Sequence, residues 1–208
     1  RRERYTHALE QFLDGQPATR LGAVFTLVNL ADGWLTDASL PTQVRREEAQ
    51  TIIDALTGCI RTPYPLAQKR QVLESGGAPE GYEGNFARDQ VALREEQLVR
   101  RTVFTEFSRR FAAVTERNEK GNGESQHTVP SLSPTWSDLR FDFGGAPIFY
   151  PLRQLHFQNA DFASATFYGP ADFSGATFHG DTSFSAAQFT ADASFHGANF
   201  NDWVGFSA

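Results

Sequence analysis

Histidine and aspartate are the side chains of this chain that could most readily do chemistry. Two of the five histidines, His179 and His196, follow phenylalanine in similar local sequences, TFHG and SFHG. Two imidazoles can bind a metal ion. These two are 17 residues apart, which would place them on adjacent faces of the coil that the Phe spacing predicts, and not one above the other. The aspartates Asp181, Asp192 and Asp202 could form a carboxylate row for acid–base work. We expect them instead to satisfy backbone amides at turns.

The single cysteine, Cys59, lies on the apolar stripe of a predicted helix, so we expect a buried and unreactive thiol. One cysteine cannot form an internal disulfide, and nothing here requires an oxidising compartment. The chain contains no HExxH, CxxC or GxSxG sequence, and GGAPEG lacks the Lys and Ser/Thr of a phosphate-binding loop. We therefore predict no catalytic residue, no metal site, no cofactor and no enzymatic activity.

Composition sets further bounds on the class of protein. The chain has 208 residues, of which 21% are charged and 40% hydrophobic, a globular balance, and a net charge of -6 that disfavours direct nucleic-acid binding. No apolar run approaches the ~20 residues of a membrane span, and no secretory signal opens the chain. It begins inside an amphipathic pattern and contains no Met, so we interpret it as a piece of a longer protein.

The last third of the chain has a regular aromatic spacing. Phe recurs at steps of five or six residues, and a mostly small residue stands two positions before each ring. Neither a helix of 3.6 residues per turn nor a strand of period two keeps such steps on one face. The predicted core rings are Phe157, Phe162, Phe167, Phe173, Phe178, Phe184, Phe189, Phe195, Phe200 and Phe206, and the predicted small core residues are Ala160, Ala165, Ala171, Ala176, Ala187, Ala193 and Ala198.

A coil that turns a corner about every five residues satisfies this spacing. Four short sides close one roughly square turn, and successive turns stack at the sheet spacing of ~4.8 Å. Rings about one turn apart then form columns, for example Phe162, Phe184 and Phe206. The sixth residue of the longer units is expected at corners, near Pro170, Asp181, Asp192 and Asp202.

The units NADFA, SATFY, PADFS, GATFH and GANFN resemble the A(D/N)(L/F)XX units of the pentapeptide-repeat family. The resemblance covers residues 155 to 208 and extends weakly back through DLRFDFGGAPIF. It implies a short right-handed quadrilateral β-helix. With the helical part that precedes it, the predicted fold class is α+β.

The first 115 residues are predicted to be helical. Stripes of apolar residues indicate three helices before Pro63, the second of them broken at Gly33, and a long helix over about 86 to 115 that carries Val91 and Leu98 on its apolar face. The segment PATRLGAVFTLVNLAD resembles a helix of a HEAT-type repeat, which implies antiparallel helix pairs. We predict a helical domain at 1–115, a flexible linker at 116–135 and a pentapeptide-repeat β-helix at 136–208.

The helical part has a second resemblance. RERYTHALEQ, TRLGAVFTLVNLAD and the helix ending in CIRTPYP are similar to a region of actinobacterial pentapeptide-repeat proteins, in which membrane-spanning helices often precede this segment. The resemblance implies a cytoplasmic location, with a membrane tether upstream of Arg1.

We predict a non-catalytic protein-interaction or scaffold module whose protein partner the sequence does not identify. Trp203 is the candidate partner contact, with local packing as the alternative. The last coil should expose a sheet edge, which favours an end-to-end homodimer. The alternative function is DNA mimicry directed at a type II topoisomerase such as gyrase. It is weakened by the modest charge of residues 139–208, where six Asp against two Arg give a net of -4.

Overall fold

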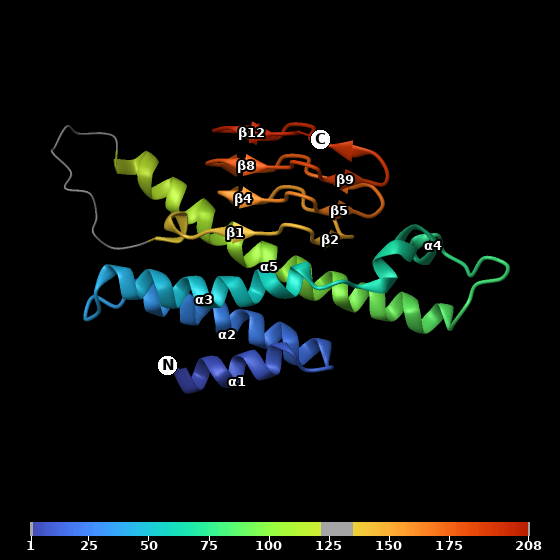
Figure 1. The fold of residues 1–208 in the computed structure, drawn as a ribbon, viewed down its shortest axis with the longest axis horizontal. Coiled ribbons are helices and arrows are strands. Elements are labelled where there is room, and N and C mark those ends of the chain that lie inside the picture. Colours follow the sequence, from blue (N-terminus) through green and yellow to red (C-terminus); the bar gives the residue numbers. More distant parts are fainter. Residues whose placement is uncertain (1, 122–134, 208) are drawn as a thin grey trace.

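The computed structural model describes residues 2–121 and 135–207, and the side chains of 112–121 are not described. A layer of helices lies beneath a stack of short strands (Figure 1). This arrangement confirms the predicted α+β class, with the helical part first and the strand stack second. The helical elements are α1 (Arg2–Phe12), α2 (Pro17–Leu35), α3 (Thr42–Arg61), the 3₁₀ helix η1 (Pro65–Lys69), α4 (Arg70–Glu74), α5 (Phe86–Gly121) and the 3₁₀ helix η2 (Trp136–Asp138).

Proline sets several of the helix boundaries. Pro17 opens α2, where its missing N–H costs nothing, and α3 begins directly after Pro41. α3 ends at Arg61 because Pro63 and Pro65 cannot continue the hydrogen-bond ladder. The predicted break at Gly33 is wrong: α2 runs through it to Leu35, since burial of the flanking apolar residues outweighs the small helix penalty of one glycine.

Helix α5 is longer than predicted, and two residues of its predicted apolar stripe are exposed. It continues to Gly121, six residues beyond the predicted end at 115, through residues that include Glu and Lys, which favour helices. Phe107 is buried, whereas Leu98 is 55% exposed. The two are nine residues apart, which at 3.6 residues per turn places them on opposite sides of the helix. Val91 is also exposed, so both residues are removed from the predicted apolar stripe.

The strands form four parallel sheets, one on each side of the coil. We call them faces A to D in the order in which the chain visits them. Face A comprises β1 (Phe141–Asp142), β4 (Ala160–Asp161), β8 (Thr182–Ser183) and β12 (Val204–Gly205), and face B comprises β2 (Pro147–Ile148), β5 (Thr166–Phe167) and β9 (Gln188–Phe189). Face C comprises β6 (Ala171–Asp172) and β10 (Ala193–Ser194), and face D comprises β3 (His156–Gln158), β7 (Thr177–His179) and β11 (Asn199–Phe200).

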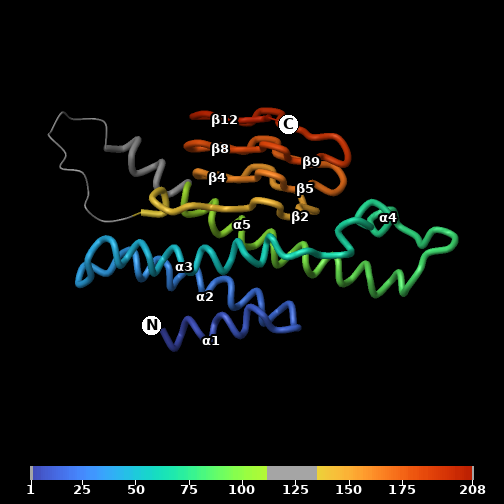
Figure 2. The backbone as a smooth tube through the Cα atoms, in the orientation of Figure 1, coloured from blue at the N-terminus to red at the C-terminus, as the bar shows by residue number. Residues whose placement is uncertain are grey.

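The pairing register defines the length of each turn. Phe141 pairs with Ala160, a step of 19 residues, whereas Thr182 pairs with Val204, a step of 22. Successive turns of the backbone lie one above another (Figure 2). Wider corners occur beside Pro170, Asp181, Asp192 and Asp202, where the sixth residue of a unit was expected, and alternate with compact turns.

Ring columns fill the inside of the coil. On face A, Phe143, Phe162, Phe184 and Phe206 stack with centroids 5.0–5.1 Å apart. Equivalent stacks join Phe167 to Phe189, Phe173 to Phe195, and Phe157 to Phe178 to Phe200, at 4.7–4.9 Å. Ala160, Ala165, Ala171 and Ala176 are buried between the columns. This spacing equals the distance between paired strands, so each turn adds one layer of rings.

The helical layer and the first turn of the coil share one hydrophobic core. Phe104 of α5 packs against Phe143 and Phe162, with ring centroids 4.6 and 6.4 Å away. Gln50 of α3 makes two 2.9 Å hydrogen bonds with the backbone of Arg140. The predicted linker falls mainly on residues 122–134, which lie outside the described residues. Among the described helices, none is both long and apolar enough to cross a membrane.

Candidate functional site

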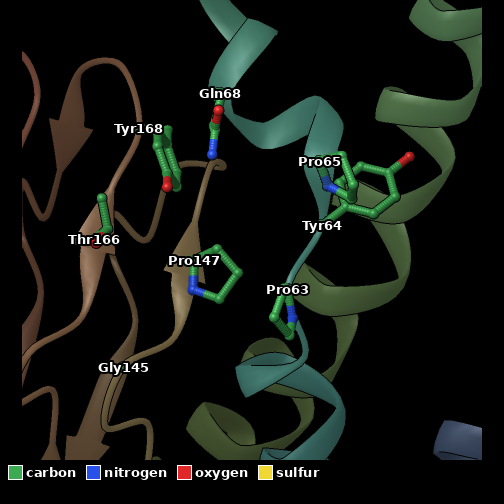
Figure 3. Close-up of a pocket in the computed structure, with 8 residues that line it drawn as sticks. All are labelled: Pro63, Tyr64, Pro65, Gln68, Gly145, Pro147, Thr166 and Tyr168. Atoms are coloured by element: carbon green, nitrogen blue, oxygen red, sulfur yellow. The ribbon is translucent and has the colours of Figure 1, made fainter.

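A groove runs between the connection from α3 to α4 and face B of the coil (Figure 3). It has two adjoining lobes of about 330 and 410 Å³, which share Gln68, Thr166 and Tyr168. We call it the face-B groove. Its other lining residues are Pro63, Tyr64, Pro65, Gly145 and Pro147 in the first lobe, and Ala67, Arg70, Gln71, Gly169, Gln188 and Thr190 in the second.

Arg70 fixes the helical wall of this groove against the coil. Its Nη1 donates to the carbonyl oxygens of Tyr168 at 2.8 Å and Pro170 at 3.3 Å, and its Nε donates to Glu74. The guanidinium lies against Gly169, where a Cβ would come within 3.2 Å of the Arg70 Cδ. Gly169 also has a φ of 73°, so this close approach needs glycine for two reasons.

Tyr64 anchors the other end of the helical wall. Its ring stacks on Phe149 with centroids 5.3 Å apart, and its hydroxyl donates to the Ala92 carbonyl at 2.9 Å. Burial raises the pKa of Tyr64 to about 12, so the phenol stays neutral. In Figure 3 the Tyr64 ring turns toward the helical side, whereas the Gln68 carboxamide reaches toward the coil beside Tyr168.

On the coil side, the groove is lined by side chains that point outward from successive strands of face B. Pro147 pairs with Thr166, and Thr166 pairs with Gln188, so these three side chains follow one another up face B. Parallel strands place such neighbours ~4.8 Å apart. Thr190 is already engaged: its hydroxyl accepts from the Gly169 N–H and donates to the Phe167 carbonyl.

Most polar groups of the groove have no protein partner. Within residues 2–121 and 135–207, no hydrogen bond joins another protein group to the side chains of Gln68, Gln71, Thr166, Tyr168 and Gln188. Arg70 is the one Lys, Arg, Asp or Glu among the lining residues, and its guanidinium is already bonded. The groove thus offers neutral donors and acceptors beside the flat surfaces of Tyr168 and Pro147, and it disfavours charged ligands, which would lose hydration without compensation.

Trp203, the predicted partner contact, lies on face A and is 59% exposed. Its ring covers Gly205, because a Cβ at that glycine would lie 2.1 Å from the indole Cη2. The residue therefore packs locally and still presents much of its surface. It borders a concavity of about 820 Å³ that extends down face A to Arg61 and Asp142, which form an ion pair.

The last layer of predicted core residues is less buried than the layers beneath it. Phe200 is 42% exposed, Phe206 is 57% exposed and Ala193 is exposed, whereas Phe189, Phe195, Ala187 and Ala198 are partly buried. In residues 135–207 no ring lies above this layer, which accounts for the exposure of residues whose side chains occupy inward positions.

Three aspartates that lie in strands of faces A and C cap turns. Asp142, Asp161 and Asp172 each accept from the backbone N–H two residues ahead, at 2.8–2.9 Å. The corner aspartate Asp202 accepts from the adjacent Trp203 N–H at 2.9 Å. The sequence predicted turn capping for Asp181, Asp192 and Asp202; among the described residues, only Asp202 of these three accepts such a bond. Asp142, Asp161 and Asp172 each stand two residues before the first amide of a compact turn, which their carboxylates can reach.

The histidine that lies close to His179 is His156, not His196. The two rings sit on face D, where β3 pairs with β7. The sequence contained the signal: His156 and His179 are 23 residues apart, close to one turn of the coil. No group of three or more His, Cys, Asp or Glu that could hold a metal ion occurs in the described parts of the chain.

A buried ion network that the sequence did not indicate joins α2, α3 and α5. Glu96 accepts from Arg20 at 2.5 Å and from Arg100 at 2.6 Å, and Arg100 donates to the Ile60 and Thr62 carbonyls. Burial acts to raise the pKa of Glu96, but the two guanidiniums outweigh it and lower that pKa. The nearby Cys59 is half-buried, less buried than predicted, and burial raises the pKa of its thiol.

The repeat segment is similar to a family of known proteins. Residues 162–208 match the family described as Pentapeptide repeats (9 copies). This segment covers faces A to D from β5 to the last coil, and it supports the pentapeptide-repeat interpretation of the strand stack. No curated protein and no solved structure gives a significant match. The resemblance of the helical part to actinobacterial proteins stays a prediction, because the matched residues begin at Phe162.

Proposed function

We propose that this chain is a non-catalytic protein-interaction module and that the face-B groove receives an extended, uncharged segment of its partner. One observation carries the proposal: within the described parts of the chain, five polar side chains without protein partners surround a groove that has no free charge. Proteins of the pentapeptide-repeat family are commonly interaction modules, which supports the general class.

The chemistry of the groove favours a peptide main chain. An extended peptide presents alternating N–H donors and C=O acceptors. The carboxamides of Gln68, Gln71 and Gln188 can both donate and accept, as can the hydroxyls of Thr166 and Tyr168. The walls come from the helical layer and from the coil, so the binding geometry depends on the docking of these two parts.

A scaffold role, a cytoplasmic location and an upstream membrane tether extend the same proposal and rest on the sequence resemblance. DNA mimicry would need unpaired carboxylates along the coil. Asp142 is paired with Arg61, and Asp172 lies 3.8 Å from Arg153, which leaves a weak acidic surface. We therefore place mimicry behind the interaction module.

A matched pair of variants tests the groove. Thr166→Arg places a long cation in the groove, whereas Thr177→Arg places the same side chain on face D. Both threonines are half-buried and begin short strands. Random peptides displayed on phage would be selected on the wild-type protein, and their affinities for both variants measured by fluorescence anisotropy.

We expect the selected peptides to be poor in charged residues. They should bind the Thr177→Arg protein as tightly as wild type and the Thr166→Arg protein at least 10-fold more weakly. Peptides that bind both variants equally would place the binding surface elsewhere. Selection of no peptide above background would overturn the proposed occupant.

A further inference from the structure

Two imidazoles meet on the outer surface of face D. His156 precedes the central Phe157 of β3, and His179 follows the central Phe178 of β7. Because Phe157 pairs with Phe178, the two histidines lie on adjacent turns and on the same outward side. Both are half-buried, so they are held by their surroundings yet reachable from solvent.

The distance between the ring nitrogens is that of a chelating pair. His156 Nδ1 lies 3.1 Å from His179 Nε2, the ring planes are 6° apart, and the ring centroids are 5.5 Å apart. Two nitrogens bound tetrahedrally at ~2.05 Å from Zn²⁺ are about 3.3 Å apart. Modest side-chain rotation would therefore turn both lone pairs toward one ion, without movement of the strands.

Neighbouring groups orient the pair. Asn201, one turn above, places its Nδ2 3.2 Å from His179 Nδ1, and Ser108 of α5 accepts from the His156 backbone N–H at 2.8 Å. Metal-binding histidines usually donate their second N–H to an oxygen acceptor, and the side chain of Asn201 carries such an oxygen beside His179. If the Asn201 amide turns, its oxygen accepts from His179 Nδ1–H and frees Nε2 as a ligand. Solvent takes the proton from Nε2 and returns one to Nδ1, so the imidazole stays neutral and no net proton is lost.

Burial lowers the pKa of His156, and burial together with the neighbouring His156 lowers that of His179. We propose that His156 and His179 form a bidentate site for a divalent first-row transition ion, with Asn201 as its orienting partner and water completing the coordination. Imidazole suits Cu²⁺, Ni²⁺ and Zn²⁺, and affinity should be highest for Cu²⁺.

Calorimetric titration of the protein with ZnCl₂ at neutral pH is the first test. We expect one ion per chain. His156→Gln or His179→Gln should weaken binding by about 100-fold, because the second ligand of a chelate acts at high effective concentration. Asn201→Ala should weaken it by ~10-fold. His196→Gln is the matched control, since His196 also follows a central Phe but lies exposed after face C, and its affinity should equal that of wild type.

Electron paramagnetic resonance of the Cu²⁺-loaded wild-type protein does not depend on any variant folding. It should report two imidazole nitrogens bound to one ion. Equal Zn²⁺ affinity of wild type, His156→Gln and His179→Gln would overturn the site, as would a Cu²⁺ spectrum with a single imidazole. Loss of binding in His196→Gln would do the same.

Discussion

At the scale of single residues, Trp203 and Gly205 pack against each other on face A. Gly205 is buried because the Trp203 ring lies directly on it, and no other residue could stand there without moving the indole. The position of Trp203 at the edge of the concavity thus depends on a missing side chain two residues away. Sequence alone identified Trp203 as outward-facing, but the contact with Gly205 depends on a rotamer that no spacing predicts.

Gly205→Ala should displace the indole, since the new Cβ would lie 2.1 Å from the ring. We expect a cost of ~1–3 kcal/mol in unfolding free energy and greater quenching of tryptophan fluorescence by acrylamide. Gly77→Ala, where nothing lies within 4 Å of the added Cβ, is the control and should leave quenching unchanged. Identical quenching in the Gly205→Ala protein would contradict the packing described for Trp203.

At the scale of elements, α5 holds the molecule together. Phe104 and Phe107 face the first turn of the coil, while Glu96 and Arg100 face the ends of α2 and α3. The apolar stripe of α5 predicted a buried helix and correctly included both Phe residues. It did not predict which other element would cover them, because a stripe records burial and not the identity of its partner.

Phe104→Ala should remove a ring that contacts Phe143, Tyr150, Phe157 and Phe162, and should cost ~3–5 kcal/mol of unfolding free energy. Leu98→Ala, on the exposed side of the same helix, should change it by about 0.5 kcal/mol or less. Urea denaturation measures both. Similar losses in the two proteins would show that α5 is not docked through Phe104.

The ion network of α5 makes stability depend on pH. Arg20 and Arg100 lower the pKa of Glu96 against the effect of burial, so the folded state binds this proton more weakly than the unfolded chain. The stabilisation is present above the unfolded pKa of about 4.3 and is lost as pH falls through the lower folded value. Urea titrations below neutral pH should show this loss in wild type.

Glu96→Gln should be less stable than wild type near pH 7 and should lose less stability on acidification. Glu95→Gln is the matched control, because Glu95 is the exposed neighbour on the same helix, and its profile should follow wild type. A Glu96→Gln profile parallel to that of wild type would remove Glu96 from the explanation of acid sensitivity.

At the scale of the whole molecule, one hydrophobic core spans the helical layer and the coil. The coil was predictable from sequence to the level of individual ring columns, since the five- or six-residue step is a local and repeated signal. The docking was not, because it depends on contacts such as Gln50 with Arg140, 90 residues apart. The His156–His179 contact joins residues that are 23 positions apart, so it follows from the sequence only when the length of one turn of the coil is known.

The open ring layer predicts self-association, the end-to-end homodimer inferred from sequence. Phe200 and Phe206 expose apolar surface beside the unpaired edge of β12, and such edges pair readily. Sedimentation velocity at increasing concentration should reveal a dimer, and Phe206→Ser should weaken it. A monomer at every concentration would exclude this contact for the chain as given.

The upper turns of the coil have a constant register, so each turn adds the same height. Each 22-residue turn sets its strands directly above those of the turn below. The coil rings that contact Phe104 of α5 lie in the lower part of the coil and reach up to Phe162. Insertion of one further turn between the existing ones would move Trp203 away from the helices by ~4.8 Å and leave both ends otherwise unchanged. The number of turns therefore fixes the distance between the helical layer and Trp203, in steps of one strand spacing.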